Sequence, residues 1–354
     1  MLVDSRVAAV QSFAYGRDQF YADKHEAAPL AEQSAIFKAS FAESAGQSAA
    51  ISYWEHSDCD VTYTGQLTFF EDKQGSHLPH LSIGQESLSL DFPVVRQQIR
   101  SSMTDLGKFS NVVVCLQGGG YNLHHYLFEI LPSMIIYRDL LERRKEILVG
   151  STSGSHFIHE LNDILDLRLN IKEIPINSRF HLDSFDVLGH FLFRVYPIEI
   201  LQKIREKIFC TNLTVRSDSK VVFIGRGDNE RNRRHLTNEP DVLNLLKFKF
   251  KNVDLLRPAL SSMAITIGNL RNAKIIVGQT GGALANLMWA ENLEQFIELV
   301  PRDYHGTTEA EELSKLLGFE YKCVFTENFV PGNWRYENQV CDLSELASII
   351  DSIL

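Results

Sequence analysis

Two polar loops in the C-terminal half of the chain carry residues suited to binding a phosphate group. One is GQTGGALAN (278–286), and the other is RGDNERNRR (226–234), which holds four arginines in nine residues. Adjacent glycines let an anion approach the backbone N–H groups at the start of a helix. An arginine side chain can bind a phosphate group through two parallel hydrogen bonds. Taken singly, the glycines are more typical of a tight turn and the arginines of a solvated loop. Together the two loops predict a diphosphate-binding site.

A third segment, NLHHYLFEILP (122–132), carries residues suited to proton transfer. His125 and Glu129 are four positions apart near the start of an expected helix, so their side chains share one helix face. Either side chain can act as a general base toward a hydroxyl group. A helix cap with a structural ion pair is equally consistent with this spacing, and a metal site is disfavoured because no third ligand is evident. The sequence leaves open which residue is the base.

The composition is that of a globular protein long enough for two domains. The chain has 354 residues, of which 44% are hydrophobic and 23% are charged, and its formal net charge is −10. This acidic balance argues against nucleic acid as a partner. The five cysteines are widely spaced and include no C-x-x-C pair, which favours a reducing compartment over a disulfide framework or a zinc site.

The chain shows no sequence signal for secretion or membrane insertion. Charged residues are scattered through MLVDSRVAAVQSFAYGRDQF at the N-terminus, so this segment does not resemble a signal peptide. No apolar run reaches the roughly 18–20 residues that a membrane-spanning helix needs. We therefore expect a cytoplasmic protein whose association with the inner face of a membrane is peripheral and is made through an assembly complex.

The elements that must position these residues differ between the two halves of the chain. Residues 1–50 indicate helices or irregular structure, and residues 51–115 indicate short strands. From residue 220 onward, apolar runs alternate with helical segments, which is typical of a parallel sheet with helices on both faces. Ligand-binding loops follow the carboxyl ends of such strands, and both polar loops lie there. The expected strands of this sheet are 220–225, 252–256, 274–278 and 296–300.

Three segments, in this order, resemble glycosyltransferase family 61 and the related bacterial capsular polysaccharide biosynthesis proteins. They are NLHHYLFEILP, FIGRGDNERNRRHLTNE, and IIVGQTGGALANLMWA with the later FIELVP, and the resemblance covers residues 110–302. The chain departs from the family pattern at Thr280, where the family has a histidine, and at Gly282-Ala283, where it has an Ala-Gly pair. The matching positions are His125, Glu129, Leu131, Pro132, Arg226, Arg233 or Arg234, Asn238, Glu239, Gly281, Leu284, Asn286 and Glu298.

This resemblance implies an α/β fold of the GT-B type, in which two Rossmann-like domains face a central cleft. The N-terminal, acceptor-side domain would span residues 1–195, and the C-terminal, nucleotide-sugar-binding domain would span residues 220–340. A linker helix and loop would join them at 196–219. The final segment, 341–354, would be a helix with Asp342 as its N-cap, in a position to cross back to the N-terminal domain.

The same resemblance implies an inverting, metal-independent glycosyltransferase without a cofactor. It would move a sugar from a nucleotide-sugar, with a UDP-sugar favoured, to a hydroxyl group of a surface glycan or its lipid-linked primer. Without a metal, the diphosphate charge must be stabilised by cationic side chains and a helix N-terminus, which the two polar loops supply. The implied roles are catalysis for Glu129 and His125; nucleotide or diphosphate binding for Arg226, Arg233, Arg234, Thr280, Gly281, Gly282, Asn286 and Glu298; and support for Asn238 and Glu239.

Two alternatives stay open. A nucleotide-sugar epimerase of the same fold would use the same cleft without an acceptor. A non-catalytic, nucleotide-sugar-binding subunit of a polysaccharide assembly complex would retain the cleft without turnover, and the departure at Thr280 keeps this alternative open. The triplet Asp58-Cys59-Asp60 matches the D-x-D metal–nucleotide pattern of glycosyltransferases with a different fold. Because it lies in a strand-rich region away from the two polar loops, we expect this match to be a coincidence.

Overall fold

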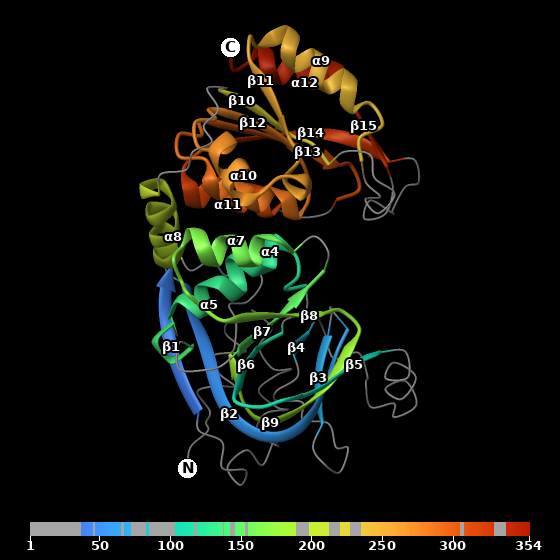
Figure 1. Cartoon of the computed structure of the whole chain (residues 1–354). Coiled ribbons are helices and arrows are strands. Elements are labelled where there is room, and N and C mark those ends of the chain that lie inside the picture. Colours follow the sequence, from blue (N-terminus) through green and yellow to red (C-terminus); the bar gives the residue numbers. More distant parts are fainter. Residues whose placement is uncertain are drawn as a thin grey trace. The chain divides into compact units, whose positions relative to one another are not determined.

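The computed structural model divides the chain into two compact units, Met1–Ile204 and Arg205–Leu354. The boundary falls within α8 (Ile198–Cys210), where the sequence predicts a linker helix. Each unit has its own β-sheet (Figure 1). The residues that the structure describes are 37–44, 47–64, 67–71, 83–84, 103–116, 119–136, 138–141, 146–152, 155–188, 198–211, 220–226, 235–304, 308–328 and 338–354.

The first unit is built on a nine-stranded mixed sheet. Its strand order is β4-β3-β2-β9-β6-β7-β8, with β1 added beside β2 and β5 beside β9. The strands from β1 to β4, with β9, pair antiparallel, whereas β9, β6, β7 and β8 pair in parallel. The strands are β1 (Phe37–Ser44), β2 (Gln47–Tyr63), β3 (Leu67–Glu71), β4 (Ile83–Gly84), β5 (Thr104–Phe109), β6 (Val112–Cys115), β7 (Glu146–Ser151), β8 (Ile171–Pro175) and β9 (Ser178–Leu188).

This sheet contradicts the helix or irregular structure expected near the N-terminus and agrees only in part with a Rossmann-like domain. Residues 37–44 and 47–50 form strands rather than helix, because β1 pairs along its whole length with β2 and this pairing overrides the helical preference of their alanines. The α/β class predicted from the sequence is confirmed, because the chain is a mixed α/β protein with two sheets. The parallel half of the first sheet matches the Rossmann-like expectation, but its antiparallel half does not.

The helices of the first unit include one interruption of α-helical geometry. Figure 1 shows α4, α5 and α7 grouped together within this unit. Between α4 and α5 the chain forms a π-helical segment, η2, in which the Leu131 N–H bonds to the Tyr126 carbonyl. Such segments are rare and are frequently found at functional sites. The helices are α4 (Leu123–His125), η2 (Tyr126–Ile130), α5 (Leu131–Ile136), α6 (Arg138–Leu141) and α7 (Phe157–Ile164).

The second unit is a doubly wound α/β sheet. Its strand order is β11-β10-β12-β13-β14-β15, and all neighbours are parallel except β14 and β15. All four residues of β10 and all seven of β13 are buried, as expected for strands covered on both faces. The strands are β10 (Val221–Ile224), β11 (Val253–Leu256), β12 (Ile275–Gln279), β13 (Gln295–Pro301), β14 (Glu320–Asn328) and β15 (Gln339–Cys341).

Helices pack on this sheet as the strand–helix alternation predicts. Buried residues of α9 and α12 share one apolar cluster with β10, β12, β13 and β14, while η4 contacts both α10 and α11. Figure 1 shows these two groups on opposite faces of the sheet. The helices are α9 (Glu239–Lys249), η3 (Pro258–Leu260), α10 (Met263–Leu270), η4 (Gly282–Trp289), α11 (Glu309–Leu317) and α12 (Leu343–Asp351).

The C-terminal helix α12 belongs to the second unit. As the sequence predicts, Asp342 is its N-cap and accepts hydrogen bonds from the N–H groups of Ser344 and Glu345. Its buried Leu346 and Ile350 lie in the cluster shared with α9 and the sheet. Its apolar face is therefore used within this unit, which differs from the return to the N-terminal domain that the resemblance implies.

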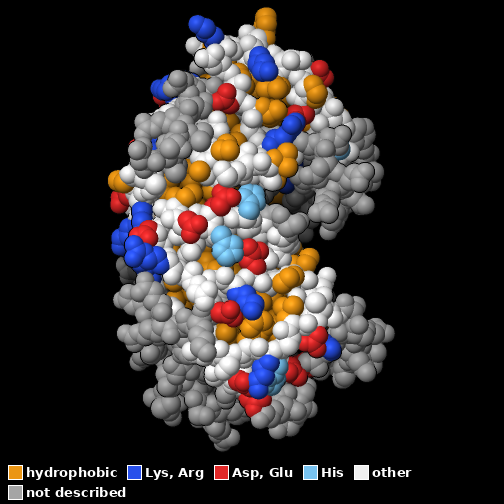
Figure 2. All heavy atoms as spheres, viewed as in Figure 1, with side chains coloured by type: hydrophobic (Ala, Val, Ile, Leu, Met, Phe, Trp, Pro, Cys, Tyr) orange, Lys and Arg blue, Asp and Glu red, His pale blue; other side chains and the backbone are white. Residues whose placement is uncertain are grey.

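The surface carries charges of both signs. On the face shown in Figure 2, acidic and basic side chains are interspersed on the described parts of each unit rather than gathered by sign. Within the described ranges, none of the helices combines the length and the apolar character that a membrane crossing requires.

Candidate functional site

The carboxyl ends of β10 and β12 flank a topological switch point in the second unit. β10 pairs in parallel with β11 on one side and with β12 on the other. The chain therefore runs from β10 outward to β11 and then returns to place β12 on the opposite side of β10. Open α/β sheets bind ligands outside the carboxyl ends of their strands at such a point. Both polar loops that the sequence predicts as phosphate-binding begin here.

Arg226 and Gly281 lie against each other at this switch point. Arg226 is the second residue after β10, and Gly281 is the second residue after β12. Gly281 has φ 147° and ψ 177°, a conformation that is essentially restricted to glycine. A Cβ at this position would also overlap the Nη2 atom of Arg226. Glycine is therefore required here both by the backbone conformation and by the close approach of the guanidinium group.

The helix that follows Gly281 adds backbone donors beside this arginine. It begins at Gly282, where the sequence predicts a helix start, but it is a 3₁₀-helix over its eight residues. The first N–H groups of a helix have no acceptor within it and carry partial positive charge. Gly281, Gly282, Ala283 and Arg226 are all half-buried, so part of each residue is open to solvent, while the Nη1 atom of Arg226 is buried. This arrangement can bind an anion such as a diphosphate.

The predicted supporting residues, Asn238 and Glu239, make hydrogen bonds within the second unit. The Asn238 side chain donates to the Cys341 carbonyl at 2.9 Å and accepts from the Cys341 N–H at 3.0 Å, which ties the start of α9 to β15. The Glu239 carboxylate accepts from Arg257 Nη2 at 2.5 Å, and its other oxygen lies 2.8 Å from the position that a Cβ of Gly225 would take. Glu239 therefore packs against the backbone next to Arg226, whereas Asn238 fixes the start of α9 on β15. Arg233 and Arg234 lie outside the described residues.

Thr280 and Glu298 lie behind the glycine turn rather than at its surface. Thr280 is buried, and both its N–H and its hydroxyl group donate to the Leu299 carbonyl, at 3.1 and 3.2 Å. Glu298 has no exposed surface, and its Oε2 accepts from the Thr308 hydroxyl at 2.6 Å and from the Tyr321 hydroxyl at 2.9 Å. Neither side chain is exposed to a ligand in this conformation, which argues against the direct contacts predicted from the sequence.

Asn286 is used within its own helix. It is fully buried, its amide donates to the Ala283 carbonyl at 2.8 Å, and its side-chain oxygen accepts from Trp289 Nε1 at 3.0 Å. Because both ends of the side chain are engaged, the structure does not bring Asn286 to a ligand as the sequence predicts. Instead it fixes the 3₁₀ geometry that presents Gly282 and Ala283.

In the first unit, His125 and Glu129 form the pair that their spacing predicts. His125 Nδ1 lies 2.7 Å from Glu129 Oε1. The side chain of Glu129 is 2% exposed and that of His125 is 25% exposed, so only the histidine is open to solvent. Asn122 caps the preceding turn by accepting from the His124 N–H, and Gly119 lies so close to the imidazole ring that a Cβ there would be 2.8 Å from Cδ2.

Burial sets the electrostatics of this pair. Desolvation raises the pKa of Glu129, and the hydrogen bond and the charge interaction with His125 oppose that rise. The result is a carboxyl group that orients the imidazole through Nδ1 and can stabilise its positive charge. A half-buried histidine held in this way by a buried carboxylate is suited to general base catalysis.

A comparison with protein families identifies the chain. The glycosyltransferase 61 family model matches residues 123–297. The chain belongs to glycosyltransferase family 61. The match includes His125, Glu129, Arg226 and Gly281, and it ends one residue before Glu298. No curated protein matches the chain. Membership of this family supports glycosyltransferase activity, which in general uses a nucleotide-sugar donor and a glycan acceptor.

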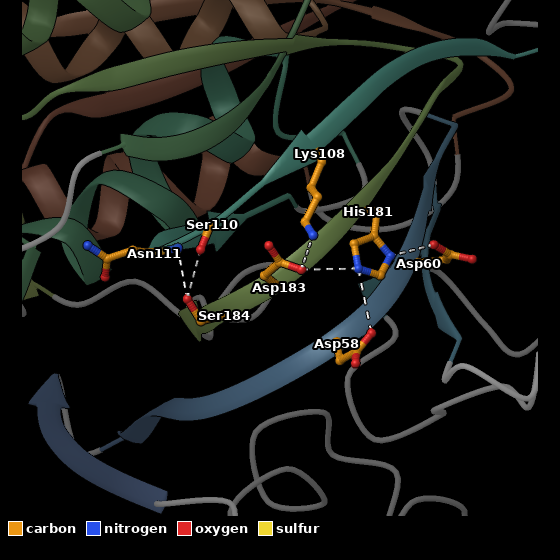
Figure 3. Close-up of polar contacts among 8 residues, drawn as sticks. All are labelled: Asp58, Asp60, Lys108, Ser110, Asn111, His181, Asp183 and Ser184. Carbon is orange, nitrogen blue, oxygen red and sulfur yellow. Dashed lines mark hydrogen bonds and ion pairs between the residues drawn. The ribbon is translucent and has the colours of Figure 1, made fainter.

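In this family 61 glycosyltransferase, the D-x-D triplet forms part of a surface charge cluster (Figure 3). His181 Nδ1 lies 2.9 Å from Asp60 Oδ1, and its Nε2 lies 3.5 Å from Asp58 and from Asp183, which also pairs with Lys108. A hollow of about 240 Å³ adjoins Asp60 and His181. Among the described residues, no group of three or more His, Cys, Asp or Glu side chains has an arrangement that could hold a metal ion.

Three residues that support the glycine turn and its surroundings were not predicted from the sequence. They are Arg257, Thr308 and Tyr321. Thr308 could have been identified as a helix start, because T-x-x-E at 308–311 is a capping pattern and Thr308 does accept from the Glu311 N–H. The Thr308–Glu298 and Tyr321–Glu298 contacts have no local sequence signal, because each joins two different elements of the fold. The same holds for the contact between Arg257 and Glu239.

Proposed function

We propose that this family 61 enzyme is an inverting, metal-independent glycosyltransferase of the GT-B type. It moves a sugar from a nucleotide-sugar, with a UDP-sugar favoured, to a hydroxyl group of a surface glycan or its lipid-linked primer. The observation that carries the proposal is the contact of Arg226 with Gly281 at the switch point of the second sheet. A cationic fork and backbone N–H groups together suit a nucleoside diphosphate, both bound and as a leaving group.

The donor site in this proposal has an inner and an outer layer. Arg226 and the N–H groups of Gly281, Gly282 and Ala283 contact the diphosphate, because these residues are only half-buried. Thr280, Asn286 and Glu298 support the turn from behind. Arg233 and Arg234 are proposed as further diphosphate contacts on the basis of the sequence pattern alone.

The proposed general base is His125, with Glu129 as its orienting partner. Glu129 is too deeply buried to reach an acceptor, whereas the imidazole is partly exposed. In the reaction the acceptor hydroxyl gives its proton to His125 as its oxygen bonds to the anomeric carbon. The bond from that carbon to the diphosphate breaks, and the nucleoside diphosphate leaves with the electron pair. A single displacement of this kind inverts the anomeric centre.

A thermal-shift screen over nucleoside diphosphates and nucleotide-sugars tests the donor site. A ligand that binds the native state raises its melting temperature by mass action. We expect UDP to stabilise the wild-type protein and to lose this effect in Arg226→Ala. Failure of every nucleotide to bind the wild-type protein would contradict the proposal.

Product analysis separates transfer from the alternatives. Incubation of a bound nucleotide-sugar with and without a glycan acceptor should give a new glycosidic linkage of inverted configuration only when the acceptor is present. An altered nucleotide-sugar formed without an acceptor would indicate an epimerase. Binding with neither transfer nor slow hydrolysis would indicate a non-catalytic subunit.

A further inference from the structure

A buried hydrogen-bond network lies directly behind the glycine turn. At its centre is Glu298 on β13, which has no exposed surface. Thr308 donates to Glu298 Oε2 and at the same time accepts from the Glu311 N–H, so it joins the carboxyl group to the start of α11. Tyr321 on β14 donates to the same oxygen. Three elements of the unit thus meet at one ionisable group.

This network is connected to the proposed anion site through Thr280. The Thr280 N–H and hydroxyl groups both donate to the carbonyl of Leu299, the residue after Glu298. The next residue is Gly281, whose conformation brings the turn against Arg226. A change in charge at Glu298 is therefore felt one residue away from the groups that would hold a diphosphate.

The surroundings of Glu298 keep its protonation state near balance at neutral pH. Desolvation raises its pKa to about 7, against opposing hydrogen bonds from Thr308 and Tyr321. Of the other titratable groups nearby, Glu309 at the start of α11 is acidic and adds to the rise, and Cys323 on β14 has its own pKa raised by burial and by Glu298. A carboxyl group in this setting changes its charge within the physiological range.

We infer that Glu298 is a positioning residue whose protonation state controls how tightly the turn at Gly281 binds the diphosphate of the donor. The inference rests on the proposed donor site and adds its regulation by pH. When Glu298 is neutral, no negative charge at this position repels an anion bound to the N–H groups of the turn. When Glu298 is ionised, a buried negative charge lies behind an anion-binding turn, and the low-dielectric surroundings screen it poorly. Donor affinity therefore falls as pH rises through neutrality.

Calorimetric titration of the full chain with UDP from pH 6 to pH 8.5 tests this inference. We expect wild-type affinity to fall about fivefold more across the range than that of Glu298→Gln, which holds the position uncharged. Glu320→Gln, which removes an exposed carboxylate on β14, is the matched control and should follow the wild type. The ionisation of UDP itself affects all three proteins equally and cancels in the comparison.

A second variant covers the case in which Glu298→Gln does not fold. Tyr321→Phe removes one donor to the carboxylate, which disfavours the ionised form, so the fall in UDP affinity should move to higher pH. An unchanged midpoint in Tyr321→Phe, or a wild-type pH profile in Glu298→Gln, would overturn the inference. If wild-type protein binds UDP and Arg226→Ala binds it more weakly, such a result removes the pH control alone. If no nucleotide binds the wild type at any pH, the donor site fails as well.

Discussion

The two candidate sites differ in their chemistry and in which of their groups are buried. At the switch point of the second sheet, the groups that would meet a ligand are a cation and backbone N–H groups, and the ionisable carboxyl group of Glu298 is buried behind them. In the first unit, Glu129 is similarly buried, but its partner is the partly exposed imidazole of His125. The first arrangement stabilises negative charge, whereas the second moves a proton. Variants should therefore separate binding from turnover.

The largest effect is expected from the proton-transfer pair. His125→Ala and Glu129→Gln should lower the transfer rate by about 10²- to 10⁴-fold, because a positioned general base contributes about that much. UDP binding should stay unchanged in both variants, since neither residue belongs to the proposed diphosphate site. Rates come from product formation at saturating donor.

The matched control for this prediction is a second His–Glu pair in the same unit. His159 lies 3.0 Å from Glu173, and its side chain is half exposed. His159→Ala and Glu173→Gln should leave transfer unaffected. Full activity in both variants of the His125–Glu129 pair would show that this pair is structural.

The next effect is expected at Arg226. Arg226→Ala should weaken UDP binding by about 1.5–3 kcal/mol, which is the usual contribution of charged hydrogen bonds. Arg302→Ala, which removes an exposed arginine paired with Glu327, is the control and should bind UDP like the wild type. Equal affinity of Arg226→Ala and wild-type protein in calorimetry would refute the anion site.

A smaller effect is expected at Gly281, where two glycine variants distinguish backbone strain from the close approach of Arg226. Gly281→Ala and Gly318→Ala both place a side chain at positive φ, and each should lose about 1–3 kcal/mol of stability in urea unfolding. A Cβ at 318 meets nothing within 4 Å, whereas one at 281 overlaps the Arg226 guanidinium. Only Gly281→Ala should therefore weaken UDP binding. Equal UDP affinity in the two variants would mean that the glycine is needed for the turn alone.

The smallest effect tests whether the shape of the arginine matters as well as its charge. Arg226→Lys keeps the positive charge but loses the planar fork, so it should weaken UDP binding by about 1 kcal/mol. An affinity as low as that of Arg226→Ala would show that paired hydrogen bonds rather than charge carry the interaction. The same calorimetric titration measures both variants.

Much of the second unit could be predicted from its sequence because the signals are local. Apolar runs such as Val221–Ile224 and Ile275–Gln279 identify buried parallel strands, and Asp342 identifies the start of the last helix. The His125–Glu129 pair also follows from spacing within one helical segment. In each case the sequence signal lies within a few residues.

The roles of Thr280, Asn286 and Glu298 were assigned from position along the chain, and burial changes them. A residue at the end of a strand can turn toward solvent or toward the next strand, and Thr280 turns toward the Leu299 carbonyl. That choice depends on a strand 19 residues away. Residues 37–44 were likewise predicted wrongly from local sequence, because pairing with β2 outweighs their local preference for helix.

The π-helical segment at Tyr126–Ile130 has a consequence for how this region can change in length. Its turn closes a hydrogen bond from Leu131 to Tyr126, five residues back, where an α-helix would close it four residues back. Deleting one residue between 126 and 130 would restore regular α-helix at little cost to the backbone. A deletion at 126–128 would also shorten the spacing of His125 and Glu129 from four residues to three, whereas a deletion at Ile130 would leave it at four. The geometry of the His125–Glu129 pair in a shortened turn therefore depends on which residue is lost.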